Sequence, residues 1–122
     1  MSVLVAALKK FNLWVGKQRA EVFNHGAASG VVSLVATDAE NRSVKRSVTA
    51  TGDITSLNVT GCVHGDEIII EIYDDGNAWT LAKHVSIEGD EPATETSNDG
   101  MPVEWHLVCI LKSGSPTMRF VN

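Results

Sequence analysis

The sequence has few of the residues on which most protein chemistry depends. Its 122 residues include two cysteines, four histidines, three prolines and one tyrosine. No stretch approaches the roughly 20 consecutive apolar residues of a membrane-spanning helix. The first ten residues are apolar before they are charged, which reverses the order of a secretory signal. We therefore expect a cytoplasmic protein with no membrane partner.

In a reducing cytoplasm, Cys62 and Cys109 would be free thiols. Two cysteines neither require nor exclude a disulfide, so the sequence leaves their pairing open.

Positive charge is also scarce. Ten Lys and Arg residues face fifteen Asp and Glu residues, for a net charge of −5, and basic residues are adjacent only at 9–10 and 45–46. Proteins that bind nucleic acids neutralise phosphates with clustered basic side chains, so DNA and RNA are not expected partners. The sequence also lacks a glycine-rich phosphate loop, a Gly-x-Ser-x-Gly elbow and a His-Glu-x-x-His stretch. We expect no cofactor and no enzyme activity.

The clearest structural signal lies in residues 57–74. Within 67–73 one parity holds isoleucine and the other holds Glu67, Glu71 and Tyr73, interrupted only by Ile69. This is the period-two pattern of a strand buried on one face. A shorter alternation precedes the glycine-bounded segment 61–65. That segment is too long for a two-residue hairpin, so it is either a wide turn or a crossing between two sheets.

Similar alternation recurs along most of the chain, separated by turns rich in Gly, Asn and Asp. Besides the pair in 57–74, strands are expected at 11–15, 19–23, 31–36, 44–48, 79–87, 103–111 and 117–121. Segments 31–36 and 44–48 are expected to form a hairpin, and 79–87 to lie antiparallel to the isoleucine strand. Residues 24–30, with two glycines, are expected to form a loop between sheets. Residues 2–10 fit a helix as well as a strand, so an N-terminal helix stays an alternative.

Eight or nine short strands predict a single all-β domain over residues 1–122. The expected architecture is an antiparallel β-sandwich of immunoglobulin-like character, or failing that a flattened barrel. Segment 88–100 carries five acids and no large apolar residue, which predicts an exposed, mobile loop. The last strand, 117–121, is expected at a sheet edge, where it could pair with a second copy and form a homodimer.

Part of the chain resembles a known family. Leu57-Asn-Val-Thr-Gly, followed by Gly65-Asp-Glu-Ile-Ile-Ile-Glu-Ile-Tyr-Asp-Asp-Gly-Asn, resembles the late strands of immunoglobulin-like and fibronectin type III-like modules. The resemblance covers residues 57–77 and implies an adhesion, structural or binding module without catalytic residues. The antibody-type pattern is not met, because Trp79 does not lie on a strand just after the first cysteine.

Four side chains have the chemistry of zinc ligands, namely Cys62, His64, His106 and Cys109. Residues 106 and 109 have opposite parity on a strand, so Cys109 is expected in the core and His106 in solvent. This favours a buried thiol and exposed histidines over a metal site. A metal-dependent enzyme using Cys62, His64 and His106 stays the second alternative.

Oxygen ligands for calcium are offered by Asp74, Asp75 and Asn77. The rest of an EF-hand loop is missing, and the same residues favour a solvated turn without any ion. They are weak candidates for a metal site.

An aromatic platform for a ligand is the remaining possibility among the side chains. Trp79 and Trp105 share parity with apolar residues and are expected in the core, which leaves Trp14 as the open tryptophan. Trp14, His25 and His64 are therefore the candidate ligand-binding residues.

By elimination, the sequence predicts a non-catalytic binding or assembly module that engages a protein partner or a second copy. A small β protein without recognisable chemistry suggests a structural or interaction protein of phage or mobile-element origin. The first alternative is a small-molecule binding protein with a pocket between sheets.

Overall fold

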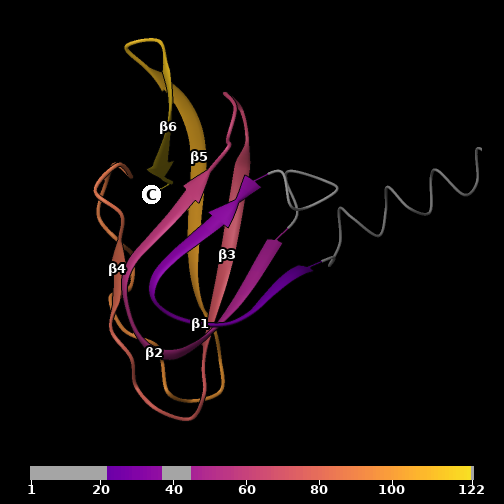
Figure 1. Cartoon of the computed structure of the whole chain (residues 1–122), viewed down its shortest axis with the longest axis vertical. Helices are drawn as coiled ribbons and strands as arrows, with labels where there is room; N and C mark the ends of the chain where they lie inside the picture. Colours follow the sequence, from indigo (N-terminus) through magenta and orange to yellow (C-terminus); the bar gives the residue numbers. More distant parts are fainter. Residues whose placement is uncertain (1–21, 37–44, 122) are drawn as a thin grey trace, which may run out of the picture.

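The computed structural model describes residues 22–36 and 45–121 (Figure 1). The six strands of this part of the chain are β1 (Val22–Val35), β2 (Lys45–Thr60), β3 (Glu67–Asp74), β4 (Leu81–Lys83), β5 (Val103–Lys112) and β6 (Ser115–Phe120). The all-β class is confirmed. The alternatives for residues 2–10 and the expected strand at 11–15 lie outside the described residues. Of the residues that are described, none form a helix long and apolar enough to cross a membrane.

The strands form one mixed sheet in the order β1-β2-β3-β5-β6, with β4 beside the second half of β2. β1 and β2 pair in parallel. The first half of β2 also pairs in parallel with β3, and the second half of β2 pairs in parallel with β4. Only the β3–β5 and β5–β6 pairs are antiparallel among these strands. The expectation of a wholly antiparallel sandwich is therefore wrong.

The parallel pairing follows from bends in the long strands. β1 and β2 each curve back on themselves, so their first and second halves lie in different layers (Figure 1). In β1 the register shifts occur around Gly26 and Gly30, which have φ of 79° and 69°. Such positive φ values suit glycine and allow a bulge without steric cost. Where β2 bends beside β1, a Cβ on Gly52 would lie 3.1 Å from the Cβ of Ser29.

The chain thus makes three stacked passes through the molecule. β1 is the first pass and β2 the second, while β3, the turn at 75–77 and β4 make the third. We call the layer formed by the first halves of β1 and β2, with β3 and β5, the first layer. The second halves of β1 and β2, with β4, form the second layer.

These bends explain where the expected pairings fail. The hairpin between 31–36 and 44–48 does not form, because β1 has already turned back and β2 starts alongside Val22. Residues 24–30 lie inside β1 and are not a loop, since their glycines make bulges without ending the strand. Only three residues of 79–87 form a strand, β4, and they pair in parallel with β2. Segment 61–65 proves to be the crossing between layers.

The core lies between the two layers and has the predicted parity. Each of the alternating isoleucines of β3 is buried, and Trp105 of β5 packs edge to face on Phe120 of β6 with ring centroids 5.3 Å apart. Arg46 is also fully buried, and its Nη2 donates a hydrogen bond of 3.0 Å to the Ala36 carbonyl. The buried hydrophobic residues are Val32, Leu34, Ala36, Val48, Ala50, Ile54, Leu57, Val59, Ile68, Ile70, Ile72, Leu81, Ile87, Trp105, Leu107, Cys109, Met118 and Phe120.

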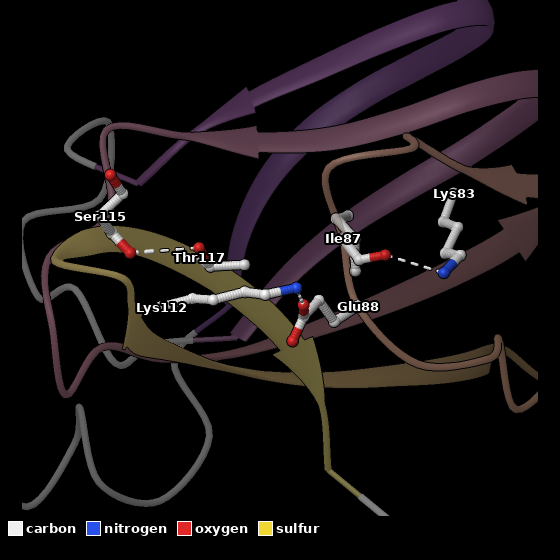
Figure 2. A network of polar contacts seen from close by, with 6 residues as sticks. All are labelled: Lys83, Ile87, Glu88, Lys112, Ser115 and Thr117. Carbon is white, nitrogen blue, oxygen red and sulfur yellow. Dashed lines mark hydrogen bonds and ion pairs between the residues drawn. The ribbon is translucent and has the colours of Figure 1, made fainter.

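The last strand is covered in part by the segment after β4. The Glu88 amide donates to the Met118 carbonyl of β6 at 3.0 Å, and the Glu88 carboxylate pairs with Lys112 of β5 (Figure 2). Lys83 holds the same segment in place, because its Nζ donates to the Ile87 carbonyl at 2.8 Å. β6 is last in the strand order, as expected, but a chain segment lies against its outer edge.

Segment 88–100 is tied to the strands at several points. The Leu81 amide donates to the Thr94 carbonyl at 2.7 Å, and the Trp105 indole N–H donates to the Ala93 carbonyl at 3.1 Å. Thr96 is buried and exchanges two hydrogen bonds with the Trp79 backbone. Most of the acids of segment 88–100 are exposed, and the mobility of the segment stays a prediction.

Two adjacent isoleucines of β3 provide a matched test of the core assignment. Ile70 is fully buried and Ile69 is half-buried on the outer face. Ile70→Ala is expected to lower the free energy of unfolding by about 2–5 kcal/mol through lost burial and a cavity. Ile69→Ala should cost clearly less, and Glu71→Ala should cost at most about 1 kcal/mol because its ion pair is near the surface. Urea unfolding measures all three, and equal losses for the two isoleucines would contradict the assignment.

Candidate functional site

The outer edge of β1 is the longest open strand edge in the described sheet. β1 comes first in the strand order and pairs only with β2 among the strands of residues 22–36 and 45–121. Its 14 residues, Val22–Val35, include no Asp, Glu, Lys or Arg. Natural proteins protect exposed edges with charged side chains, prolines or bulges, because unpaired N–H and C=O groups can pair with another chain. β1 has bulges but neither charge nor proline.

The bulges protect only part of β1. Register shifts interrupt residues 24–31, whereas Val31 to Val35 pair continuously with Ser56 to Thr60. In a regular strand segment, alternate residues point their N–H and C=O groups away from the partner strand in one straight row. A bulge interrupts that row. Residues 31–35 are therefore the part of β1 best suited to accept another strand. We call this segment the open edge.

Side chains at the open edge are small, apolar or uncharged. Val31 is 80% exposed, an unusual position for a valine on a strand. Val32 and Leu34 point into the core, while Ser33 is exposed on the outer side. The neighbouring residues 56–60 of β2 are also uncharged.

The outer face of the first layer differs, because it carries a network of charges. Lys45 Nζ lies 3.8 Å from both the Glu71 and the Glu104 carboxylates. His106 Nε2 lies 2.6 Å from Glu67 Oε1, so His106 faces outward as predicted. Two copies of a protein with net charge −5 repel each other least where their surfaces are uncharged. The open edge meets this condition and the face of β3 and β5 does not.

The candidate ligand-binding residues fall on different parts of the molecule. His25 belongs to β1 itself, where its ring centroid is 4.9 Å from that of Phe23. His64 is exposed in the turn between β2 and β3. Trp14 lies outside the described residues. The structure thus places His25 on the same strand as the open edge, while His64 belongs to the crossing between layers.

The weak metal candidates brace a turn. Asp75 Oδ1 accepts hydrogen bonds from the Asn77 amide, the Asn77 side chain and the Trp79 indole, the last at 2.7 Å. The Trp79 hydrogen bond holds the pKa of Asp75 below its usual value. Asp74 Oδ1 accepts from the Gly76 amide at 2.9 Å. Within the described ranges, no three His, Cys, Asp or Glu side chains lie together as a metal ion would require.

The two cysteines are neighbours, a pairing that the sequence left open. Their Sγ atoms are 2.9 Å apart, although the residues are 47 positions apart in the chain. Cys109 is fully buried on β5, as predicted, and Cys62 is half-buried at the start of the crossing. Burial and the adjacent Cys109 thiol raise the pKa of Cys62 to about 12. The sequence carries no signal for this pair, because the two cysteines become neighbours only through the pairing of β3 with β5.

The histidines do not join the thiols. His64 is exposed, and His106 faces outward to Glu67 while Cys109, three residues further along the same strand, faces the core. The four zinc-type side chains are therefore divided between a buried thiol pair and two surface histidines.

No protein-family model, no curated protein and no solved structure matches this chain. The resemblance of residues 57–77 to immunoglobulin-like modules stays a prediction.

The raised pKa of Cys62 predicts how its alkylation depends on pH. At pH values below the pKa of a thiol, the fraction present as thiolate rises tenfold for each pH unit. The thiolate is the reactive form. Alkylation of Cys62 by iodoacetamide should therefore rise about 100-fold from pH 8 to pH 10, against about fourfold for a model thiol of pKa about 8.5. Mass spectrometry of the Cys62 peptide measures the rate.

The control is Cys109→Ala, which removes the neighbouring thiol that helps to raise the pKa. It should increase the rate at pH 8 and flatten the pH profile. A wild-type rate that levels off by about pH 9.5, as an ordinary thiol does, would contradict the assignment.

Proposed function

We propose that the chain is a non-catalytic assembly module that joins a second copy of itself through the open edge of β1. The observation that carries this proposal is an exposed, regular strand edge without charge, bordered by a valine that is 80% exposed. A strand edge of this kind offers main-chain hydrogen bonds to an added strand, the recognition mode called β-augmentation. Binding in this mode needs no nucleophile, metal or cofactor.

A second copy is the partner that the edge fits best, because the segment is compatible with itself. A two-fold axis near Ser33 would pair two open edges in antiparallel fashion and set Val31 opposite Val35 of the partner subunit. Val32 would then lie opposite Leu34 of the partner subunit on the inner side. Cross-strand pairs of β-branched and aliphatic side chains stabilise antiparallel strands by about 0.2–1 kcal/mol each. Such an interface is isologous, and it closes after two copies.

Electrostatics supports the same choice of surface. Each copy carries a net charge of −5, so two copies repel at long range. Pairing at the open edge adds no like-charge contact between its own side chains, since residues 31–35 are Val, Val, Ser, Leu and Val. An edge that had to exclude other copies would be expected to carry Lys or Glu at the exposed position of Val31.

The proposal agrees with the binding or structural role that the immunoglobulin-like resemblance implies, and it does not depend on that fold. The small-molecule alternative is less well supported, because the space between the layers is filled by large side chains such as Trp105 and Phe120. The metal-dependent alternative is weakened by the divided positions of Cys62, His64 and His106.

Val31→Lys tests the open edge directly. The side chain is exposed, so the substitution should change the free energy of unfolding by no more than about 0.5 kcal/mol. In the proposed interface the new Lys side chain lies opposite Val35 of the partner subunit, and a charged side chain on an edge strand opposes pairing with another strand. The wild type is expected to sediment as a dimer at micromolar concentrations, and Val31→Lys as a monomer.

Val85→Lys is the matched control. Val85 is 93% exposed in the turn after β4, and the charge added is the same. β4 pairs with β2 on the side opposite to β1, so β2 lies between β4 and the β1 edge. This variant should remain a dimer. A monomeric wild type across the concentration range, or equal dissociation in the two variants, would exclude the proposal.

A further inference from the structure

The cysteine pair has a geometry that its reduced state does not require. Cys109 lies on β5 and Cys62 in the crossing that follows the second pass, and the two Sγ atoms are 2.9 Å apart. Disulfide formation needs an S–S distance of about 2.05 Å, so the sulfur atoms have to approach by less than about 1 Å. The two residues are brought together by the fold and not by closeness in sequence.

Backbone contacts hold Cys109 and the segment that follows Cys62 in place independently of the sulfur atoms. The Cys109 amide donates to the Asp66 carbonyl at 2.7 Å, and the Gly65 amide donates to the Cys109 carbonyl at 2.9 Å. The crossing itself is braced, since the Val63 amide donates to Asp66 Oδ2 at 2.9 Å and the Asp66 amide donates to the Val63 carbonyl at 3.0 Å. Because the backbone is fixed on both sides, joining the sulfurs requires little rearrangement beyond the side chains.

We propose that Cys62 and Cys109 form a reversible intramolecular disulfide when the protein meets a disulfide oxidant. Cys62, the more accessible of the two, loses its proton to solvent, and its thiolate attacks one sulfur of a small disulfide such as oxidised glutathione. The S–S bond of the oxidant breaks and releases one thiolate. Cys109 then loses its proton and attacks Sγ of Cys62, which releases the second small thiol. The two protein thiols are oxidised by two electrons, and one small disulfide is reduced to two thiols.

The disulfide would lock the crossing between layers onto β5. It would close a loop spanning 47 positions, and a cross-link across a loop of this length removes substantial entropy from the unfolded chain. The locked segment includes His64 and Val63, both exposed at its surface. The crossing would thus be more firmly held in an oxidising compartment than in a reducing one, where the pair stays as thiols.

The test compares the reduced full chain before and after incubation with oxidised glutathione, without denaturant, at about pH 9.5, because the raised pKa of Cys62 leaves little thiolate at lower pH. We expect free thiols to fall from two to none, the intact mass to fall by two hydrogen atoms, and one peptide pair to link Cys62 to Cys109. The midpoint of thermal unfolding should rise by on the order of 10 °C. Dithiothreitol should reverse all four changes.

Cys62→Ser and Cys109→Ala are the controls. Neither should form an internal disulfide, and neither should gain thermal stability on oxidation. Three outcomes would overturn the proposal: two free thiols persisting in the folded wild type, a stable glutathione adduct, or disulfide-linked dimers in place of the internal bond. A lower midpoint of thermal unfolding after oxidation would contradict the claim that the disulfide holds the crossing onto β5.

Discussion

The structure depends on one backbone constraint, the reversal of β1 and β2 within their own lengths. β1 and β2 pack closely against each other where they reverse. Gly52 leaves room for Ser29, and the hydroxyl of Thr51 donates a hydrogen bond to the Ala28 carbonyl. The third pass joins the second at the same level, where the Thr80 amide donates to Asp53 Oδ1 at 2.9 Å. Since every pass runs in the same direction, neighbouring passes pair in parallel without the helical crossovers that parallel strands usually need.

The placement of functional groups follows from this stacking. Because the second pass ends in one layer and β3 starts in the other, the chain must cross between layers in segment 61–65. The crossing meets the end of β5, which pairs with β3, and this is what brings Cys62 to Cys109. The first pass has a neighbour on one side only, among the strands described, which leaves the edge of β1 open. The thiol pair and the open edge are thus two consequences of the same topology.

The sequence predicts which side chains are buried much better than which strands are neighbours. Alternation placed Ile70, Trp105 and Cys109 in the core, because burial depends on the local period of a strand. Pairing depends on backbone hydrogen bonds between distant segments, and those leave little trace in residue type. Glycines 26 and 30 predicted a loop for the same reason: composition shows that the chain can adopt positive φ there, but not that pairing with β2 continues across the bulges.

The candidate sites show the same division. Ligand chemistry could be assigned to single residues such as His64 and Asp75, but their neighbours depend on the fold. Asp75, for example, accepts a hydrogen bond from Trp79, which residue type alone does not reveal. The open edge could not be predicted, because a strand is an edge only by its place in the order of the sheet. The expected edge strand, β6, is indeed last, but its hydrogen-bonding groups are partly satisfied by Glu88.

The two edges of the sheet are treated differently, and this difference supports a functional role for β1. At β6 a chain segment supplies backbone hydrogen bonds, Arg119 adds an exposed charge, and the Lys112–Glu88 ion pair holds the cover in place. Covering an edge strand with a chain segment and placing a charge on it are both recognised ways to prevent edge-to-edge association. Over residues 31–35 of β1 neither charge nor bulge is present, although Val31 is exposed. An unprotected edge carries a risk of aggregation. Among residues 22–36 and 45–121 one edge is protected and the other is regular and uncharged, which is the arrangement that assembly through β1 requires.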